Sequence, residues 1–339
     1  MRRVCLLRHA RPDFPFGARI CLGRTDLPLG AFGRMQACRT ALCMADLTFE
    51  AVYASPLQRA VETAGFFSPD VRIVEDLREM DCGDWDGLDF EEIQRRWPEI
   101  YAARGKDLSL PMPNAERAEA VRERAERALN QILAETTGDV LIVTHSFVIR
   151  SLLKDYSARL PYASLTILDE PGAVGLTPET PLTPGLADLL LTVASPGAQI
   201  EAHCRAVERE ARRIADALPI ALDVDLLSAA ALLHDVARAE SHHAQTGARW
   251  LRELGYESAA YIVAQHNDHD SAILNEGAVL FLADKCVLAD QVVPLAERFA
   301  ASEAKCLTEE AKEAHARRLH SAETLREQVN ALCGREIVI

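Results

Sequence analysis

The feature that most limits the fold of this chain is a set of short apolar runs that do not alternate with polar residues. Four such runs predict strands: VCLLR (4–8), AVYAS (51–55), VRIVE (71–75) and VLIVT (140–144). A continuous apolar run indicates a strand that is covered on both faces. Amphipathic stretches between the runs predict helices near 30–46, 56–67, 88–104, 114–136 and 146–158. We therefore expect an α/β three-layer sandwich with a largely parallel sheet.

The pattern changes after residue 170. Residues 170–199 are rich in Pro, Gly and Thr, which favours a connecting segment over a packed element. The stretches beyond it have helical spacing and no convincing strand: IEAHCRAVEREARRIADAL, LLSAAALLHDVARAE, HAQTGARWLREL and AVLFLADKCVLAD. The sequence predicts an α/β domain over 1–175, a linker over 176–197 and an all-α domain over 198–339.

Composition excludes several classes of partner. The formal net charge is -14, and an acidic surface repels phosphate backbones, so we expect no nucleic-acid partner. No apolar stretch approaches the roughly 20 residues that span a bilayer, so we expect no membrane partner. The nine cysteines form no CxxC pair, which favours reduced thiols in the cytoplasm. The oligomeric state is left open, a homo-oligomer included.

Side chains suited to phosphate chemistry follow three of the predicted strands. His9 follows the first strand directly after Arg8, His145 follows VLIVT, and Arg59 begins the helix after AVYAS. The carboxyl ends of strands in an open α/β sheet form its ligand site. Arginine suits phosphate oxygens, and a histidine beside them can form a covalent phosphohistidine. A departing alcohol needs a proton, which Glu79 in LREMDCGDWDG can supply.

The motifs that carry these residues resemble the histidine phosphatase superfamily, which includes the cofactor-dependent phosphoglycerate mutases. They are LLRHARP, GRTDLPLGAFG, SPLQRAVETA, LREMDCGDWDG and VLIVTHSFVIRSLL, in the order of the family and over about residues 1–160. LREMDCGDWDG is similar to the α-ribazole phosphatase branch. The resemblance implies a phosphoglycerate mutase-like fold and a phosphatase that needs no cofactor. It implies that His9 is the nucleophile and Glu79 the proton donor, while Arg8, Arg59 and His145 hold the phosphoryl group.

A few positions depart from the family pattern. Ala10 and Ser146 stand where the family usually has a glycine after each histidine, and both are small enough for the pocket to form. The usual Gly-Glu-Ser segment is replaced by residues 114–117, so its substrate contacts are not predicted. Arg19 is a further candidate to line the phosphate pocket. A phosphomutase, which returns the phosphoryl group to a second hydroxyl, is the alternative; the GDWDG segment and short insertions favour a phosphatase.

A second group of functional residues lies in the helical half. Six of the ten histidines fall between His203 and His269. The residues with metal-ligating side chains come in the order His203, His234, Asp235, His243, His266 and Asp284. Imidazole and carboxylate ligands without a thiolate suit Fe, Mn, Co, Ni, Zn or Mg rather than a structural zinc site. Leu232 and Leu233 predict that this helix is buried, and its burial would exclude bulk water from a metal ion that catalyses hydrolysis.

This half resembles the HD superfamily of metal-dependent phosphohydrolases. AHCRAV, LLHDVAR and FLADKC carry the resemblance over about 198–295, and HHAQTGARWL and VAQHND resemble the two-metal branch. The resemblance implies one or two divalent ions on the six ligands, with Arg238 as a nearby cation and no role for His242 or His269. We expect a bifunctional phosphohydrolase acting on a small phosphorylated metabolite and on a nucleotide or related phosphoester. A non-catalytic, ligand-sensing HD domain that regulates the phosphatase is the alternative.

Overall fold

The computed structural model describes residues 2–14, 18–168, 173–174, 181–269, 273–304 and 306–338. The chain forms two compact units, Met1–Pro178 and Glu179–Ile339. The predicted domain boundary at 175 and the first part of the predicted linker, 176–180, lie outside the described residues.

The rest of the predicted linker is wrong, because it contains helix α7 (Pro184–Ala194). The hydroxyl of Thr183 caps this helix by accepting the backbone N–H of Leu186, and Pro184 stands in its first turn. Threonine and proline are therefore helix-start signals here, although their abundance suggested a linker. Leu190 and Leu191 are fully buried, and α7 packs on α9 (Val224–Leu233) of the second unit.

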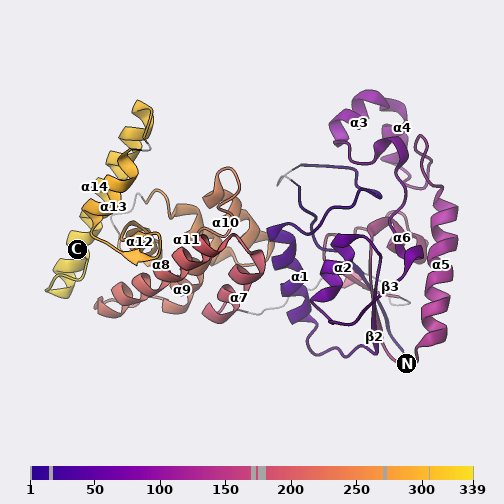
Figure 1. Cartoon of the computed structure of the whole chain (residues 1–339), viewed down its shortest axis with the longest axis horizontal. Helices are drawn as coiled ribbons and strands as arrows, with labels where there is room; N and C mark the ends of the chain where they lie inside the picture. Colours follow the sequence, from indigo (N-terminus) through magenta and orange to yellow (C-terminus); the bar gives the residue numbers. More distant parts are fainter. Residues whose placement is uncertain are drawn as a thin grey trace. The chain divides into compact units, whose positions relative to one another are not determined.

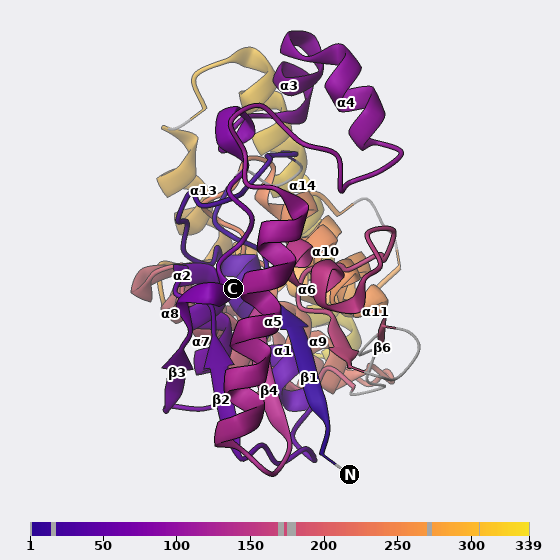
Figure 2. The same cartoon turned by 90° about the vertical axis from the view of Figure 1, so that its right-hand side faces the viewer.

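The first unit is built on one six-stranded sheet. Its strands are β1 (Val4–Arg8), β2 (Ala51–Ala54), β3 (Val71–Ile73), β4 (Val140–Thr144), β5 (Leu165–Ile167) and β6 (Ala173–Val174). The order is β3-β2-β4-β1-β5-β6, and Figure 2 shows the four parallel strands β3, β2, β4 and β1 side by side. The parallel sheet was predicted. The antiparallel strands β5 and β6 were not, because three and two residues are too few to show a strand pattern.

Helices cover both faces of this sheet. The covering helices are α1 (Ala31–Cys43), α2 (Gln58–Gly65), α5 (Ala118–Glu135) and α6 (Ser146–Leu153). Helices α3 (Phe90–Arg96) and α4 (Pro98–Arg104) lie beyond one end of the strands (Figure 2). Helices α1 and α2 lie on one side and α5 and α6 on the other (Figure 1). Leu6 and Ile142 pack in the core shared with α5 and α6, whereas Leu7 and Val143 pack in the opposite core with α2. The predicted three-layer sandwich is confirmed.

The helix predicted over 88–104 is two helices, α3 and α4. The break falls at Trp97, which has φ -134° and ψ 61°, and Pro98 begins the next helix. Proline lacks the N–H of a helix interior and disfavours the helical conformation of the residue before it. By contrast α5 is one regular helix, because its buried positions recur at three- and four-residue spacing. These positions include Ala118, Val121, Ala125, Ala128 and Ile132.

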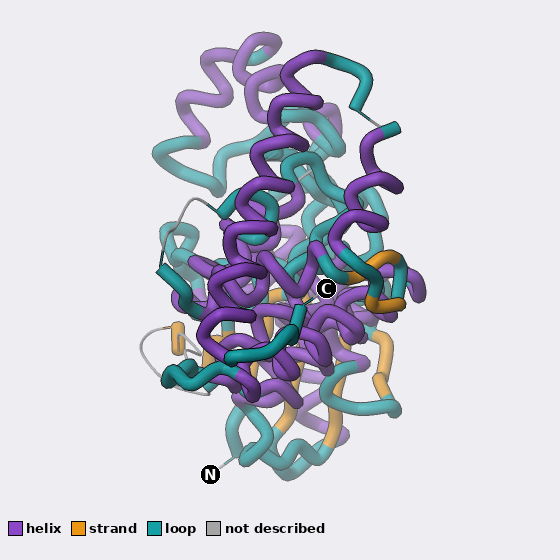
Figure 3. The backbone as a smooth tube through the Cα atoms, turned by 90° about the vertical axis from the view of Figure 1, so that its left-hand side faces the viewer, coloured by secondary structure: helices purple, strands orange, loops and turns teal. Residues whose placement is uncertain are grey.

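The second unit is helical, as predicted. After α7 and α9 its helices are α8 (Ala198–Ala217), α10 (His243–Glu253), α11 (Glu257–Gln265), α12 (Glu276–Lys285), α13 (Leu295–Glu303) and α14 (Glu309–Cys333). Figure 3 shows this unit with helices in purple. Helices α9 and α12 are buried along most of their length and both pack against α8. A hairpin of β7 (Val287–Leu288) and β8 (Gln291–Val292) was not predicted.

Two predictions from composition concern the chain as a whole. All nine cysteines are free thiols. Within the described residues, no helix has both the length and the apolar character that crossing a membrane requires.

Candidate active site and metal centre

The first site lies at the carboxyl ends of β1 and β4. These strands are paired in parallel with Arg8 opposite Thr144, so the residue after each strand is a histidine at the same edge. The ring centroids of His9 and His145 are 5.0 Å apart. The backbone N–H of His9 donates to the carbonyl of Thr144 at 2.9 Å. The sheet therefore fixes both imidazoles side by side.

The hydrogen bonds of His9 determine which ring nitrogen can act as a nucleophile. Nδ1 lies 2.8 Å from the carbonyl oxygen of Ala10, which can only accept, so Nδ1 carries the proton. Nε2 then keeps its lone pair. The Ala10 N–H donates to the hydroxyl of Thr63 at 3.0 Å, which fixes this turn. Burial lowers the pKa of His9 well below its ordinary value, and Arg59 and Arg8 lower it further, so the ring is neutral.

Two arginines beside His9 present unsatisfied donors. Arg59 is fully buried, and its two terminal nitrogens donate to the carbonyls of Thr25 (2.8 Å) and Gly23 (2.7 Å). One terminal nitrogen of Arg8 donates to the carbonyl of Leu160 at 2.5 Å. Within the described residues, Nε of each arginine is buried without a hydrogen-bond partner. Leaving such a charged donor unpaired is costly, and an anion at this point would satisfy both.

His145 has one satisfied and one open nitrogen. Its Nε2 lies 2.7 Å from the hydroxyl of Ser55, at the end of β2. Its Nδ1 is buried and has no partner among the described residues. Burial lowers the pKa of His145 well below its ordinary value, with His9 and Arg59 adding to the shift. The open nitrogen of a neutral ring is suited to a hydrogen bond with a phosphoryl oxygen.

Glu79 lies in the same site with its carboxyl group buried. Oε1 accepts the N–H of Met80 at 2.9 Å, and Oε2 faces the N–H of Phe147 in the first turn of α6 at 3.4 Å. Burial raises the pKa of Glu79, although these N–H groups and the arginines oppose the shift. The guanidinium of Arg124 holds the backbone carbonyl of Glu79 at 3.1 Å and bonds Glu116 at 2.8 Å. A carboxyl group with a raised pKa can carry the proton that a leaving alcohol needs.

One predicted residue of this site, Arg19, is not tested by the structure, and one residue of the site was not predicted. The guanidinium of Arg19 lies over the ring of Phe90 at 5.5 Å, and the side chain is exposed, so its predicted role in the pocket stays a prediction. Sequence reasoning did not single out Tyr162, whose ring lies against His9 and Arg8. No signal in the sequence pointed to it.

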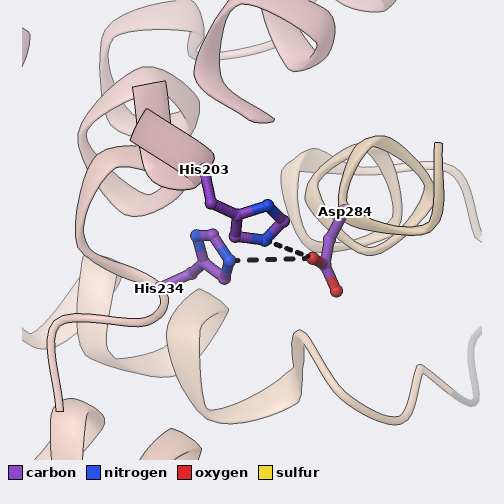
Figure 4. Close-up of side chains that lie close together, drawn as sticks. All are labelled: His203, His234 and Asp284. Carbon is purple, nitrogen blue, oxygen red and sulfur yellow. Dashed lines mark hydrogen bonds and ion pairs between the residues drawn. The ribbon is translucent and has the colours of Figure 1, made fainter. Parts of the chain in front are cut away.

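The second site gathers residues from four helices of the second unit. His203 lies in α8, His234 and Asp235 follow α9, His266 follows α11 and Asp284 lies in α12. Two groups have ligand atoms within 4.8 Å of one another: His203 with His234 and Asp284, and His234 with Asp235 and His266. Figure 4 shows both imidazoles of the first group directed at the carboxylate of Asp284. Nε2 of His203 lies 3.1 Å from Oδ1 of Asp284, and that of His234 lies 3.7 Å from it.

Three of these histidines share one orientation. Nδ1 lies 2.7 Å from a backbone carbonyl oxygen in each: Ala289 for His203, Ala231 for His234 and Val263 for His266. Each Nδ1 therefore carries a proton, and Nε2 is the nitrogen of each ring that faces the cluster. Metal-ligating histidines are commonly oriented by such a second hydrogen bond. Nε2 of His234 is buried and, within the described residues, has no hydrogen-bond partner, so the donor set fits a metal ion.

The protonation states of the cluster also suit a metal. Burial lowers the pKa of His234 to about 4, so this ring is neutral at pH 7. Burial alone would raise the pKa of Asp235 and Asp284, but the surrounding histidines, and Lys285 beside Asp284, hold both well below their ordinary values. Metal ligation requires neutral imidazoles and ionised carboxylates. The chain provides a neutral His234 and two ionised carboxylates, whereas burial of His203 is outweighed by Asp284, which raises the pKa of that ring in the absence of a metal.

A second metal ion would need Asp235 to face both groups of ligands and His243 to lie beside it. Oδ1 of Asp235 lies 3.2 Å from Nε2 of His243 and 3.5 Å from Nε2 of His266, whereas Oδ2 lies 3.8 Å from Nε2 of His234. Asp235 thus faces both ligand groups. Nε2 of His243 also lies 3.0 Å from the guanidinium of Arg238 and 3.2 Å from the side-chain amide of Asn267.

The two remaining histidines of this region, which were assigned no role, differ in their surroundings. His242 is exposed and has a left-handed backbone conformation, with φ 50°. His269 is buried beside the ring of Phe281, and it belongs to neither ligand group found in the described residues.

Comparison with known proteins follows the division into two units. Residues 4–169 match the histidine phosphatase superfamily (branch 1), and residues 200–288 match the HD domain. The uncharacterized phosphatase PhoE of Bacillus subtilis is 33% identical over 174 residues, which are 50% of this chain and 84% of that protein. The bifunctional protein Rv2228c of Mycobacterium tuberculosis is 33% identical over 182 residues, which are 49% of this chain and 50% of that protein.

Solved structures similar to the chain include the α-ribazole phosphatase of Shigella flexneri. It is 27% identical, covers 49% of this chain and 90% of that chain, and has a TM-score of 0.43. For the first unit, the motifs, the site at the strand ends and the similarity to PhoE all indicate a histidine phosphatase. For the second unit, the cluster of metal-ligating side chains and the family match both indicate an HD domain. The chain belongs to the histidine phosphatase superfamily through residues 4–169 and carries an HD domain at residues 200–288.

Proposed function

We propose that the chain is a bifunctional phosphohydrolase with a phosphohistidine-dependent phosphatase site in the first unit and a metal-dependent HD site in the second. The observation that carries the first activity is the neutral His9 with a free Nε2 beside two arginines whose Nε groups are unsatisfied. The second activity rests on the convergence of three Nε2 atoms and two carboxylates. Small phosphorylated metabolites suit the first site, and nucleotides or related phosphoesters suit the second.

The geometry of the first site supports a two-step displacement. Nε2 of His9 attacks phosphorus as the bond to the leaving oxygen breaks, and the proton of Glu79 goes to that oxygen. Arg8, Arg59 and His145 stabilise the charge on the remaining oxygens. In the second step Glu79 takes a proton from a water molecule, whose oxygen attacks the phosphohistidine and releases phosphate and His9.

The second site would hold a divalent ion on His203, His234, Asp235 and Asp284, and a second ion on Asp235, His243 and His266. When bound, a divalent ion supplies Lewis-acid activation for phosphoester hydrolysis. The residues of this chain orient it: backbone carbonyls fix the tautomers of His203, His234 and His266. Burial of His234 and Asp235 keeps bulk water away from the ligands. Arg238, at the border of the cluster, can hold a substrate phosphate.

Removal of metal should leave the first activity intact. The His9-dependent hydrolysis of p-nitrophenyl phosphate, taken as the rate of the full chain minus that of His9→Ala, should change by less than about twofold with EDTA. The reason is that arginine side chains, rather than a metal ion, stabilise the negative charge on the phosphoryl oxygens. Measuring the metal content of the same sample verifies that the chelator worked. A His9-dependent rate that disappears with the metal would contradict the proposed mechanism.

Glu79→Gln should slow poor leaving groups much more than good ones. A general acid contributes about 10²- to 10⁴-fold where the leaving oxygen needs its proton, so an alkyl phosphate should slow by this factor. Hydrolysis of p-nitrophenyl phosphate should slow far less, because its leaving group departs as an anion. Rates for both substrates are compared with those of Glu123→Gln, a change at an exposed position of α5. Equal losses on the two substrates would remove Glu79 from this role.

The pH profile tests the same assignment. The first step needs a neutral His9 and a protonated Glu79. Burial lowers the pKa of His9, which extends activity to lower pH, and raises that of Glu79, which extends activity to higher pH. The loss of activity on the alkaline side should be absent in Glu79→Gln, and an unchanged alkaline limb would argue against Glu79 as its source.

A further inference from the structure

The turn that precedes β5 is attached to the nucleophile strand at several points. The N–H of Ala163 donates to the carbonyl of His9 at 3.2 Å, and the N–H of Arg8 donates to the carbonyl of Ser164 at 3.0 Å. The Arg8 guanidinium also donates to the carbonyl of Leu160. Leu160 and Ala163 are buried. The turn therefore has one position relative to His9 and Arg8.

Tyr162 stands at the middle of this turn and contacts both residues. The guanidinium carbon of Arg8 lies 3.9 Å from the centroid of the Tyr162 ring, and the ring of His9 lies 5.5 Å from it. A planar guanidinium stacks well on an aromatic face. The ring covers one face of the Arg8 guanidinium, and the carbonyl of Leu160 occupies one of its terminal nitrogens.

These two contacts limit how Arg8 can turn. Its Nε is buried and has no hydrogen-bond partner among the described residues, so this donor is open to a ligand. An unstacked arginine samples several side-chain conformations, and holding it in one before the ligand arrives removes that entropic cost from binding. Arg8 is thus set in place before any anion binds.

We infer that Tyr162 is the positioning residue of the phosphatase site: its ring holds Arg8 in the orientation that binds a phosphoryl anion beside His9. Tyr162 acts through Arg8. The inference rests on the proposed phosphatase function, and it assigns a role to a side chain outside the five residues carried over from the family motifs.

The test measures anion affinity in the full-length chain, with orthovanadate and inorganic phosphate as probes. Tyr162→Leu removes the aromatic face, and Tyr162→Phe keeps it. Tyr162→Leu should weaken inhibition by both anions by about tenfold, a factor in the range of a partly desolvated cation–π contact. Tyr162→Phe keeps the ring and loses only the hydroxyl, which also interacts with Arg8, so it should weaken inhibition several-fold less than Tyr162→Leu. In Tyr162→Leu the KM for p-nitrophenyl phosphate should rise more than kcat falls.

A double-mutant cycle separates positioning from general stability. Arg8→Lys removes the planar group that stacks, so Tyr162→Leu should cost little further anion affinity in that background. If Tyr162→Leu is unfolded at the assay temperature, Tyr162→Asn, whose side chain suits a turn, replaces it. Full additivity with Arg8→Lys, unchanged affinity in Tyr162→Leu, or equal losses in Tyr162→Phe and Tyr162→Leu would each overturn the inference. An unchanged chain that binds no vanadate would instead overturn the proposed phosphatase function.

Discussion

His9→Ala is expected to lower kcat for phosphomonoesters at the first site by at least about 10⁴-fold, the scale on which loss of a covalent nucleophile acts. His9 is held by the sheet, its Nδ1 proton is fixed by Ala10, and Nε2 is its only free lone pair. His145 does not duplicate this arrangement: when its Nε2 accepts from the Ser55 hydroxyl, its Nδ1 carries the proton and has no lone pair for attack. The measurement is steady-state hydrolysis of a phosphomonoester.

The same variant tests for the covalent intermediate. A turnover reaction with ³²P-labelled substrate, stopped in denaturant at alkaline pH where phosphohistidine survives, should leave the label on Nε2 of His9. Metal content should not change in His9→Ala, since the two clusters lie in separate compact units. Label on another residue would refute the assignment. Decay of the label into inorganic phosphate indicates a phosphatase, whereas its transfer to a second hydroxyl of the substrate indicates a phosphomutase.

Asp235→Asn is expected to weaken divalent metal binding in the second unit by at least about 100-fold. Asp235 faces both ligand groups: one oxygen lies near His243 and His266 and the other near His234. The substitution keeps the shape of the side chain but removes the negative charge that opposes the cation. Metal content after dialysis and metal titration of the apoprotein measure the loss.

A matched control lies on α9, the helix that Asp235 follows. Asp225 is an exposed residue in the first turn of α9, so Asp225→Asn makes the same chemical change away from the cluster and should leave metal affinity unchanged. His9-dependent phosphatase activity should persist in both variants. Retention of metal by Asp235→Asn at the level of Asp225→Asn would show that the ion is bound elsewhere. Metal binding without hydrolysis of any nucleotide or phosphoester would support the sensor alternative for the HD domain.

Local pattern was enough to predict most of the fold. The apolar runs that became β1, β2 and β4 are covered on both faces, whereas β3 is an edge strand with Arg72 and Ile73 exposed, contrary to the prediction. The three- and four-residue spacing of buried positions in α5 and α8 matches their helices. Predictions were wrong where the same residues serve two purposes. Pro98 ends one helix and begins another, and Thr183 with Pro184 begins a helix inside a stretch with the composition of a linker.

The amino-acid sequence by itself determined which residues could meet at each site, because a motif at a strand end or a helix end fixes its place in the topology. It could not determine protonation or orientation. The proton positions of His9, His203, His234 and His266 depend on carbonyls that accept from each ring, and burial keeps His9 and His234 neutral by lowering the pKa of each. Tyr162 reaches Arg8 across 154 positions of chain only because β5 pairs with β1. Such contacts arise from packing between distant segments, so only the tertiary structure decided them.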